Sequence, residues 1–440
     1  MADKIDMPEL KVRVEQLRPG MYIRLTDINW SRHPFLRSSF KIKSKAQIEA
    51  LISYEINEVK YVPSLSEVDP RKFVKPRGRG EKTNIPDATG SGEKKKTDRL
   101  KQVAKKRQLK AAKEAEMAST RKMFLGIADI LNEINQHTEV LERAFKNTDD
   151  PQKFMAAATK VATRIAKKAP GGDSALVYAL NIRRPLKNLA RHSVNVSYLS
   201  TMIAKELGIK KPKVEEISLG ALLHDVGLVL QDARHLKDRR GLNWSKPANR
   251  AAHPLVGREY LFKVNGTSCE VKNIIFKHKE RLDGSGQPNR IDGDDFDVCS
   301  EIVALANLYE NFCDGFSDFD DLPQMTPFQA VAYLYYKQKG SAFRTNTVEA
   351  LCDVLGPTPP GTTIRLTDGG IGVVVANNPE DYETPYIVLY NDHAKVFERV
   401  VLPLGKNRDI KILDSIRFDT LSKEVQNYFC APDTWGAGDF

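Results

Sequence analysis

One adjacent histidine–aspartate pair and three further histidines are the residues best suited to carry chemistry. The pair, His224 and Asp225, sits inside an apolar run, with His192 upstream and His253 and His278 downstream. Each histidine taken singly is more often an ordinary core or surface residue than a ligand. Together they change that balance, because a His-Asp pair in an apolar segment costs desolvation unless something pairs with it. Imidazole and carboxylate ligands, with the carboxylate bridging two cations, predict a metal site suited to phosphate-ester hydrolysis.

The elements that must position these residues are predicted to be helices. Apolar residues recur at three- and four-residue steps through residues 117–355, which is typical of amphipathic helices. His192 falls on one such segment, and His224 and Asp225 fall on another that we expect to continue through Val226. A helix advances about 100° per residue, so both members of the pair can face a metal only if they border a cavity. Pro254 suits the first position of a helix beginning near His253.

The chain is expected to contain four regions. Residues 8–65 alternate apolar and polar residues around a Pro-Gly turn and a short helical segment, which predicts a small α+β domain. Residues 66–116 read as a basic linker, disordered at first and helical from about Asp98. Residues 117–355 form the helical body. Residues 356–415 change to strand-like runs and predict a β-hairpin appendage. The fold class is therefore mainly all-α, with small α+β and β parts at its two ends.

The positive charge of the chain is concentrated in the linker. The formal net charge is +11, but residues 71–116 alone hold 16 Lys and Arg against 6 Asp and Glu. The rest of the chain is nearly neutral, so the basicity is not a property of the fold. A solvated linker leading into a basic helix explains this composition. Contact with nucleic acid or with an anionic membrane through the linker is the alternative.

Length and composition narrow the class of protein. A chain of 440 residues should divide into two or three domains. It has no apolar run long enough to span a membrane, and its first residues lack the pattern of an export signal. Five scattered cysteines without a CxxC pair fit reduced thiols. We therefore expect a cytoplasmic protein.

The order of these motifs resembles the HD-GYP family, bacterial metal-dependent phosphodiesterases that hydrolyse cyclic-di-GMP. The resemblance covers roughly residues 180–340, and the parts that carry it are His192, His224-Asp225-Val226-Gly227, His253-Pro254, His278-Lys279-Glu280 and Asp283-Gly284-Ser285-Gly286-Gln287-Pro288. The segment Leu17–Tyr22 also resembles the small domain that often precedes HD-GYP. The resemblance implies an all-helical HD-type bundle and a divalent metal cofactor, dinuclear in the family, with iron or manganese as the expected metal.

The resemblance also implies roles for individual residues. The implied metal ligands are His192, His224, Asp225, His253 and His278, with Asn307 as a weaker one. His224 and Asp225 are the implied catalytic residues, because they would hold the metal that activates water. The implied substrate-binding residues are Lys279, Gly286, Gln287 and Pro288. We expect cyclic-di-GMP, a signalling protein such as a diguanylate cyclase or response regulator, and a second copy of the chain as candidate partners.

Several positions depart from the family pattern. Lys279 replaces the second His of a His-His pair, and an ammonium has no lone pair to give a metal. Asn307 replaces a ligand aspartate with a weaker, neutral amide donor. Leu228 stands where the family has a lysine, and Gln287 replaces the tyrosine of Gly-Tyr-Pro. An acidic stretch, residues 314–321, stands where the family has an Arg-Pro-Tyr-Arg segment.

These departures leave two hypotheses open, because all of them weaken the same reaction. The first is a diverged cyclic-di-GMP phosphodiesterase with reduced activity. The second is a catalytically inactive HD-GYP-like module that binds or regulates a protein partner. A nucleic-acid- or membrane-associated protein acting through the linker is the third and weakest.

Overall fold

The computed structural model describes residues 9–25, 39–53, 56–68, 92–169, 171–182, 188–232, 252–314, 323–381, 383–392, 399–404 and 410–430. The chain divides into two compact units. Unit 1 comprises residues 1–122 and 389–401, and unit 2 comprises residues 123–388 and 402–440. Each unit is described by itself below.

Unit 1 contains a small antiparallel sheet beside one helix. Its elements are β1 (Leu10–Arg13), β2 (Tyr22–Arg24), β3 (Ser39–Lys41), α1 (Lys45–Ser53) and β4 (Glu58–Tyr61). The strands are arranged in the order β1-β4-β2-β3, and every pair is antiparallel. Apolar residues from the strands and from α1, among them Met21, Ile23 and Leu51, are fully buried in one cluster. The alternating pattern of the sequence therefore corresponds to one apolar face of this sheet.

The long helix α2 runs from Gly92 to Phe145 and belongs to both units. It begins earlier than the expected helix start near Asp98, and it continues past residue 116, where the linker was expected to end. Its alanines, lysines and glutamates are good helix formers, so no residue in this stretch stops the helix. The part of the expected linker between residues 69 and 91 lies outside the described residues.

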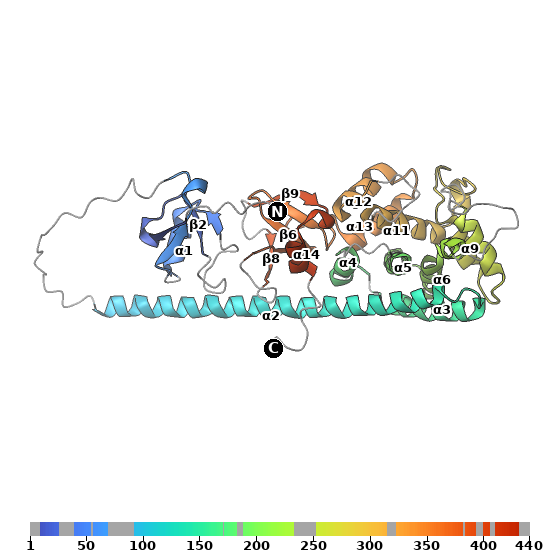
Figure 1. Cartoon of the computed structure of the whole chain (residues 1–440), viewed down its shortest axis with the longest axis horizontal. Helices are drawn as coiled ribbons and strands as arrows, with labels where there is room; N and C mark the ends of the chain where they lie inside the picture. The colour runs from blue at the N-terminus through green and yellow to red at the C-terminus, as the bar shows by residue number, and fades with distance from the viewer. Residues whose placement is uncertain are drawn as a thin grey trace, which may run out of the picture. The chain divides into compact units, whose positions relative to one another are not determined.

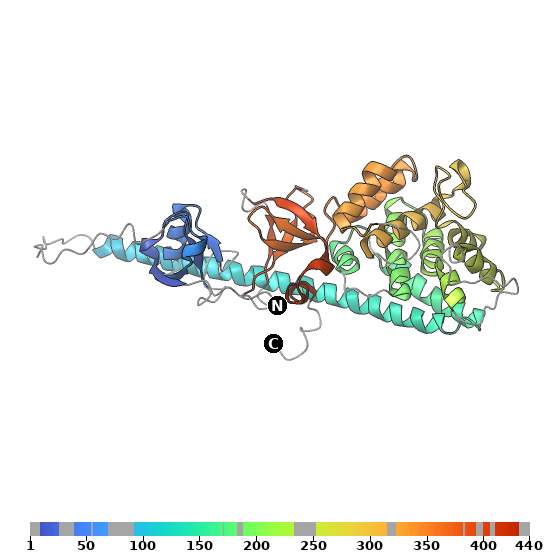
Figure 2. The same cartoon turned by 45° about the horizontal axis from the view of Figure 1, so that its top comes forward.

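Unit 2 is built on packed helices. These are α3 (Pro151–Lys168), α4 (Ser174–Asn181), α5 (Leu189–Glu206), α6 (Lys211–Leu223), α7 (Val226–Asp232), α9 (His253–Phe262), α10 (Cys269–Lys277), α11 (Val298–Asp314), α12 (Pro327–Tyr333), the π-helix η6 (Leu334–Gln338) and α13 (Thr345–Leu355). Helix α5 packs against α6 and α11, and α10 packs against α6, α9 and α11 (Figures 1 and 2). Nearly all of α5 and α11 is buried, so these two helices form the centre of the bundle.

A five-stranded sheet follows the helices. Its strands are β5 (Thr363–Leu366), β6 (Ile371–Ala376), β7 (Tyr386–Leu389), β8 (Val401–Pro403) and β9 (Ile412–Ile416), in the order β8-β7-β6-β5-β9 (Figure 2). Strand β5 pairs antiparallel with both β6 and β9. The turn at Asp368–Gly370 joins β5 to β6, as the sequence predicts, and Gly369 adopts the positive φ that this turn requires. Strand β9 pairs with β5 across a long stretch of chain, and α14 (Lys423–Cys430) follows it.

The predicted fold class is confirmed: a mainly helical chain with a small α+β part before the bundle and a β part after it. Within the described part of the chain, every helix is too short or too polar to cross a bilayer.

Candidate metal centre

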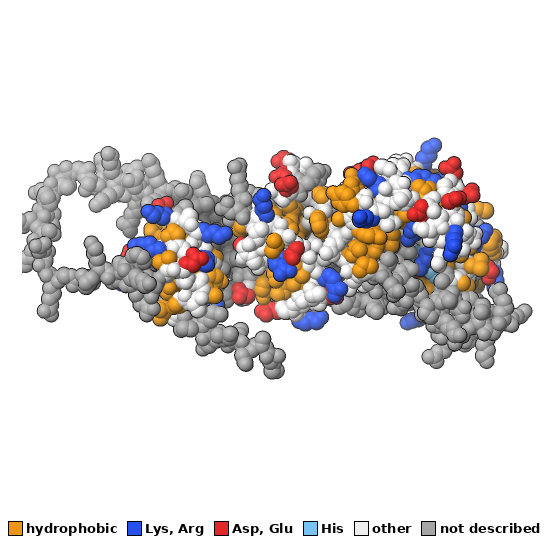
Figure 3. Space-filling model, turned by 90° about the horizontal axis from the view of Figure 1, so that it is seen from above, with side chains coloured by type: hydrophobic (Ala, Val, Ile, Leu, Met, Phe, Trp, Pro, Cys, Tyr) orange, Lys and Arg blue, Asp and Glu red, His pale blue; other side chains and the backbone are white. Residues whose placement is uncertain are grey.

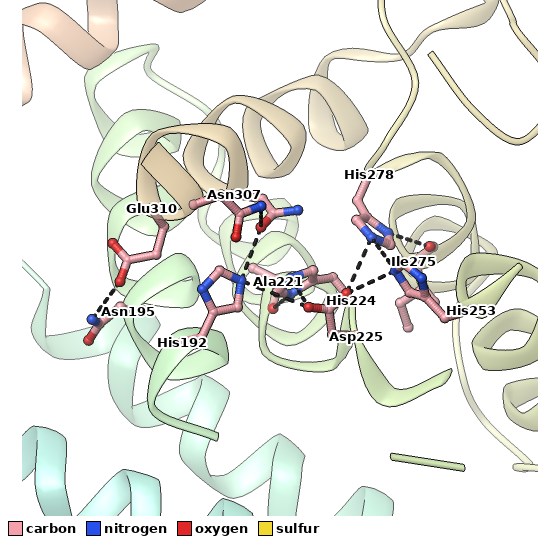
Figure 4. A network of polar contacts seen from close by, with 11 residues as sticks. His192, Asn195, Ala221, His224, Asp225, His253, Ile275, His278, Asn307 and Glu310 are labelled. Carbon is pink, nitrogen blue, oxygen red and sulfur yellow. Dashed lines mark hydrogen bonds and ion pairs between the residues drawn. The ribbon is translucent and has the colours of Figure 1, made fainter. Parts of the chain in front are cut away.

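Five elements of unit 2 bring the predicted ligands together (Figure 4). Helix α5 supplies His192, and α11 supplies Asn307. Residues 224–225 lie in the turn between α6 and α7, and His253 is the first residue of α9. His278 directly follows α10. The ligands come from helices that are distant in sequence, so only the packing of the bundle creates the site.

The sequence predicted that the histidine–aspartate pair lies inside one continuous helix. The structure instead places the pair between two helices. Helix α6 ends at Leu223, and the backbone N–H of Leu228 donates to the carbonyl of Asp225, which starts α7 (2.9 Å). Both residues lie in this turn, His224 still with helical backbone angles (φ −54°, ψ −36°), and both side chains reach the same centre.

Gly227 explains how His253 reaches this turn. A Cβ atom added to Gly227 would overlap the carbonyl oxygen of His253 and approach the backbone N of Gly257 to 3.0 Å. The starts of α7 and α9 thus touch backbone to backbone, which only glycine permits at this position. Pro254 in the first turn of α9 also needs no hydrogen-bond acceptor for its nitrogen. Gly227 of the His-Asp-x-Gly motif and His253 of the His-Pro motif therefore meet in one backbone contact.

The candidate metal ligands form two groups that share Asp225. In the first group, called the His192 half-site, Oδ2 of Asp225 lies 3.2 Å from Nε2 of His224 and 3.8 Å from Nε2 of His192. Oδ1 of Asn307 lies 3.0 Å from the same His192 nitrogen. We count His192, His224, Asn307 and Oδ2 of Asp225 as this half-site.

The second group, called the His278 half-site, contains Oδ1 of Asp225 with His253 and His278. Oδ1 lies 3.0 Å from Nε2 of His253 and 3.5 Å from Nε2 of His278, and the two nitrogens are 3.1 Å apart. Ligands about 2.0–2.2 Å from one cation are separated by roughly these distances. The carboxylate therefore presents one oxygen to each half-site, as a bridging ligand would.

Hydrogen bonds fix two of the rings in the form that binds metal. Nδ1 of His224 donates to the carbonyl of Ala221, and Nδ1 of His278 donates to the carbonyl of Ile275, both at 2.7 Å. A carbonyl can only accept, so the proton is on Nδ1 and the lone pair of Nε2 faces the centre. Nε2 of His224 is buried, and no hydrogen bond reaches it within the described structure. The site therefore fits a cation at this atom.

The electrostatic setting also favours metal-binding forms. Burial lowers the pKa of His192, with a further contribution from His224, and burial lowers the pKa of His278 to about 3. Burial opposes ionisation of Asp225, but the adjacent His224 and the close contacts of His253 and His278 hold its pKa well below its usual range. Neutral His192 and His278 and an ionised Asp225 are the forms of these groups that ligate a metal.

The predicted substrate-binding residues lie on the loop after α10. Lys279 is half-buried and its carbonyl accepts from the backbone N–H of Gln287 (3.1 Å). Gly286 is buried against the backbone of Glu280, where an added Cβ would overlap, whereas the side chains of Gln287 and Pro288 are exposed. The loop thus places an exposed Gln-Pro segment close to the chain that follows His278.

Glu280 holds this loop, a role that the sequence did not reveal. Its side chain is fully buried and accepts from the backbone N–H groups of Asn289 (2.7 Å) and Ile291 (3.2 Å). A buried carboxylate with two backbone donors is a strong local constraint. A glutamate directly after a histidine and a lysine gives no sign of such a role, because its partners follow only after a turn.

The remaining departures from the family pattern fall in different places. Leu228 is buried in the first turn of α7 with 4% of its surface exposed, so an apolar side chain fills the position of the family's lysine. Asp314 ends α11, but residues 315–321 of the acidic stretch lie outside the described residues.

Two carboxylates lie beside His192, and the sequence did not reveal their position there. Glu310, with 2% of its surface exposed, and Asp314 approach His192 so that one ligand atom of each residue lies within 4.8 Å of the others. The amide of Asn195 donates to Glu310 (2.7 Å) and holds it in place. Asn307, Glu310 and Asp314 are spaced by three and four residues on α11, a pattern that predicts one shared helix face.

Known families and proteins match this chain in a consistent way. A domain of unknown function (DUF3391) matches residues 9–159, and an HD domain matches residues 177–343. The chain is 24% identical over 254 residues to the cyclic di-GMP phosphodiesterase PA4108 of Pseudomonas aeruginosa, covering 57% of this chain and 60% of that protein. It is 30% identical over 165 residues to the cyclic di-GMP phosphodiesterase response regulator RpfG of Xanthomonas campestris pv. campestris, covering 36% of this chain and 40% of that protein.

One solved structure is also similar, Bd1817, an HDG"Y"P protein from Bdellovibrio bacteriovorus. The identity is 19% and the TM-score 0.39, with 79% of this chain and 99% of that chain covered. The chain spans less than two thirds of the length of the two phosphodiesterases named above.

The helical bundle with a buried histidine–aspartate centre defines an HD-domain protein. Within that class, the chain belongs to the HD-GYP family of bacterial signalling proteins, as the sequence predicts. HD-domain phosphodiesterases depend on metal ions, and the two groups around Asp225 are candidate metal-binding clusters.

Proposed function

We propose that this chain is a cyclic-di-GMP phosphodiesterase whose turnover is strongly reduced. The observation that carries the proposal is the shared Asp225, which presents one oxygen to each of two histidine groups. The relatives PA4108 and RpfG, both named cyclic di-GMP phosphodiesterases, support the substrate class. The five cysteines are free thiols, and this supports a cytoplasmic location.

The residues of this chain supply the ligands of a metal centre that would act on the phosphodiester. A divalent cation at the centre would polarise a phosphoryl oxygen and lower the pKa of water. Asp225 and the neutral imidazoles would hold it, and the carbonyls of Ala221 and Ile275 would keep the rings in the required orientation. Iron or manganese is our choice of metal, because both accept mixed imidazole and carboxylate ligands.

Three positions support the reduced rate. Asn307 offers a neutral amide oxygen in place of a carboxylate, and Lys279 offers no lone pair. Leu228 is apolar and buried, so it provides no positive charge for the phosphate. Each loss of a group that stabilises the transition state costs about 10²- to 10³-fold in rate. The losses act on one reaction and are not additive.

A hydrolysis assay on the full chain tests the proposal. Protein loaded with Mn²⁺ or Fe²⁺ should convert cyclic-di-GMP slowly into the linear dinucleotide or GMP. The double variant His224→Ala/Asp225→Ala provides the background, because it removes ligands of both half-sites. Turnover of the metal-loaded native chain that does not exceed this background would rule out the enzyme.

An inactive interaction module is the second candidate function. The observation that favours it is an exposed aromatic group at α12 and η6: Phe328 is 42% exposed, Tyr335 37% and Tyr336 78%. Hydrophobic side chains gather on the face of unit 2 that is seen from above in Figure 3. Large exposed aromatic side chains are enriched in protein interfaces.

Binding to a diguanylate cyclase or a response regulator separates the two functions. For an interaction module, Tyr336→Ser should weaken binding, whereas His224→Ala/Asp225→Ala should leave it unchanged. Binding that depends on the double variant, with the fold intact by circular dichroism, would count against a module independent of the metal centre.

A further inference from the structure

The two half-sites differ in the donors that remain to them. The His192 half-site keeps four donor atoms: two imidazole nitrogens, one carboxylate oxygen and the amide oxygen of Asn307. The His278 half-site keeps three, and the next residue along its turn is Lys279. A side-chain amide is a weak ligand, but an ammonium is none.

The charges around the half-sites differ in the same direction. Glu310 and Asp314 lie beside His192, and Figure 4 shows Glu310 on the side of the centre away from His253 and His278. Asn195 holds Glu310 there by a hydrogen bond of 2.7 Å. Carboxylates next to a ligating histidine raise its basicity and favour a cation, whereas Lys279, the residue after His278, gives the other half-site no ligand.

A shared carboxylate also limits how many cations the centre can hold. Dications in two-metal sites are about 3.5–4 Å apart and repel each other strongly in a buried site. Asp225 is the carboxylate placed between the half-sites here, and Asn307 contributes no charge. A second cation would therefore be poorly compensated once the first is bound.

We propose that this centre binds one divalent cation tightly, in the His192 half-site, favoured by the negative charge of Glu310 beside His192. The His278 half-site binds a second cation only weakly. This inference rests on the proposed metal dependence of the same site, but it concerns metal occupancy and is independent of turnover.

Manganese binding to the full chain tests the inference. Protein stripped with a chelator is dialysed against Mn²⁺, and bound metal is measured by elemental analysis and by electron paramagnetic resonance. We expect about one tight equivalent and the spectrum of an isolated Mn²⁺ ion. The matched pair His224→Ala and His278→Ala locates it: the first variant should lose the tight equivalent and the second should retain it.

Two further variants test the reasons for the asymmetry. Lys279→His should add a second equivalent and the spectrum of two coupled Mn²⁺ ions, because it supplies the missing imidazole. Glu310→Gln should weaken the tight site by about tenfold or more, the usual effect of an altered outer carboxylate. Glu139→Gln is the control, an exposed carboxylate of α2 that is paired with Arg143 outside both half-sites (3.2 Å).

The outcomes are decisive in each direction. Two equivalents of similar affinity in the native chain would overturn the inference, as would no bound Mn²⁺. One equivalent that His278→Ala removes and His224→Ala keeps would place the cation in the wrong half-site. If His224→Ala fails to fold, the gain of metal in Lys279→His still decides. One bound Mn²⁺ without hydrolysis would leave the inference standing and reject only the proposed activity.

Discussion

The two half-sites of the centre share one aspartate and differ in almost everything else. The His192 half-site lies between the buried helices α5 and α11, with carboxylates behind its histidine. The His278 half-site lies where helices end and a loop begins, next to a lysine. Ligands carried by packed helices have changed only in the type of one donor. In the half-site near the loop, Lys279 offers no donor atom at all.

Replacing the bridging carboxylate of Asp225 should weaken metal binding in both half-sites. Asp225→Asn replaces the carboxylate that both half-sites use, and an amide would give neither half-site a charge. We expect Mn²⁺ affinity to fall by more than about 100-fold in a chain that still folds, because losing a shared charged ligand should exceed the effect of losing an outer carboxylate. Equilibrium dialysis measures the fall, and circular dichroism checks the fold. Retention of a tight Mn²⁺ site would show that the bridge is dispensable.

Filling the contact between α7 and α9 should disturb the centre through its scaffold. Gly227→Ala places a methyl group on the carbonyl of His253, so the two helix starts must separate. We expect a loss of about 2–4 kcal/mol in the free energy of unfolding, the range for strain in a packed core. Gly126→Ala in α2 is the matched control, because nothing lies within 4 Å of its added Cβ.

Urea denaturation should show that Gly126→Ala leaves the free energy of unfolding unchanged or raises it by about 0.5–1 kcal/mol. Equal effects of the two glycine variants would refute the role of Gly227.

Loosening the loop should affect only the His278 half-site. Glu280→Gln removes one of two acceptors for the backbone N–H groups of Asn289 and Ile291, at a cost of about 1–3 kcal/mol. Hydrogen exchange should speed up at residues 281–292, while tight Mn²⁺ binding stays unchanged. Glu349→Gln is the control, because the side chain of Glu349 is 50% exposed. We expect it to change the free energy of unfolding by less than about 0.5 kcal/mol. Loss of the tight Mn²⁺ would mean that the half-sites are not separable.

The sequence predicted the kinds of elements better than their ends. Helical periodicity located the bundle, and the Asp-Gly-Gly turn located the β5–β6 hairpin, because both signals are local. The apolar period through Leu223 and Val226 predicted one helix where two meet, since a break between buried helices leaves the hydrophobic pattern intact. The pairing of β9 with β5 joins strands far apart in the chain, and no local signal specifies it.

The site was predicted in part for similar reasons. The resemblance supplied His192, His224, Asp225, His253 and His278, and the structure brings all five side chains together. It did not indicate Glu310, whose role depends on how α11 packs against α5. Nor did it indicate Glu280, because the donors to that carboxylate return to it only through the folded loop.

Restoring the altered ligands tests the central claim most directly. The double variant Lys279→His/Asn307→Asp gives the His278 half-site an imidazole and the His192 half-site a carboxylate. Cyclic-di-GMP hydrolysis by this variant and by the native chain is compared at saturating Mn²⁺. Our account predicts a rise in turnover of about 10²-fold or more over a slow but measurable native rate. A native chain that hydrolyses nothing, or a double variant no faster than the native chain, would contradict it.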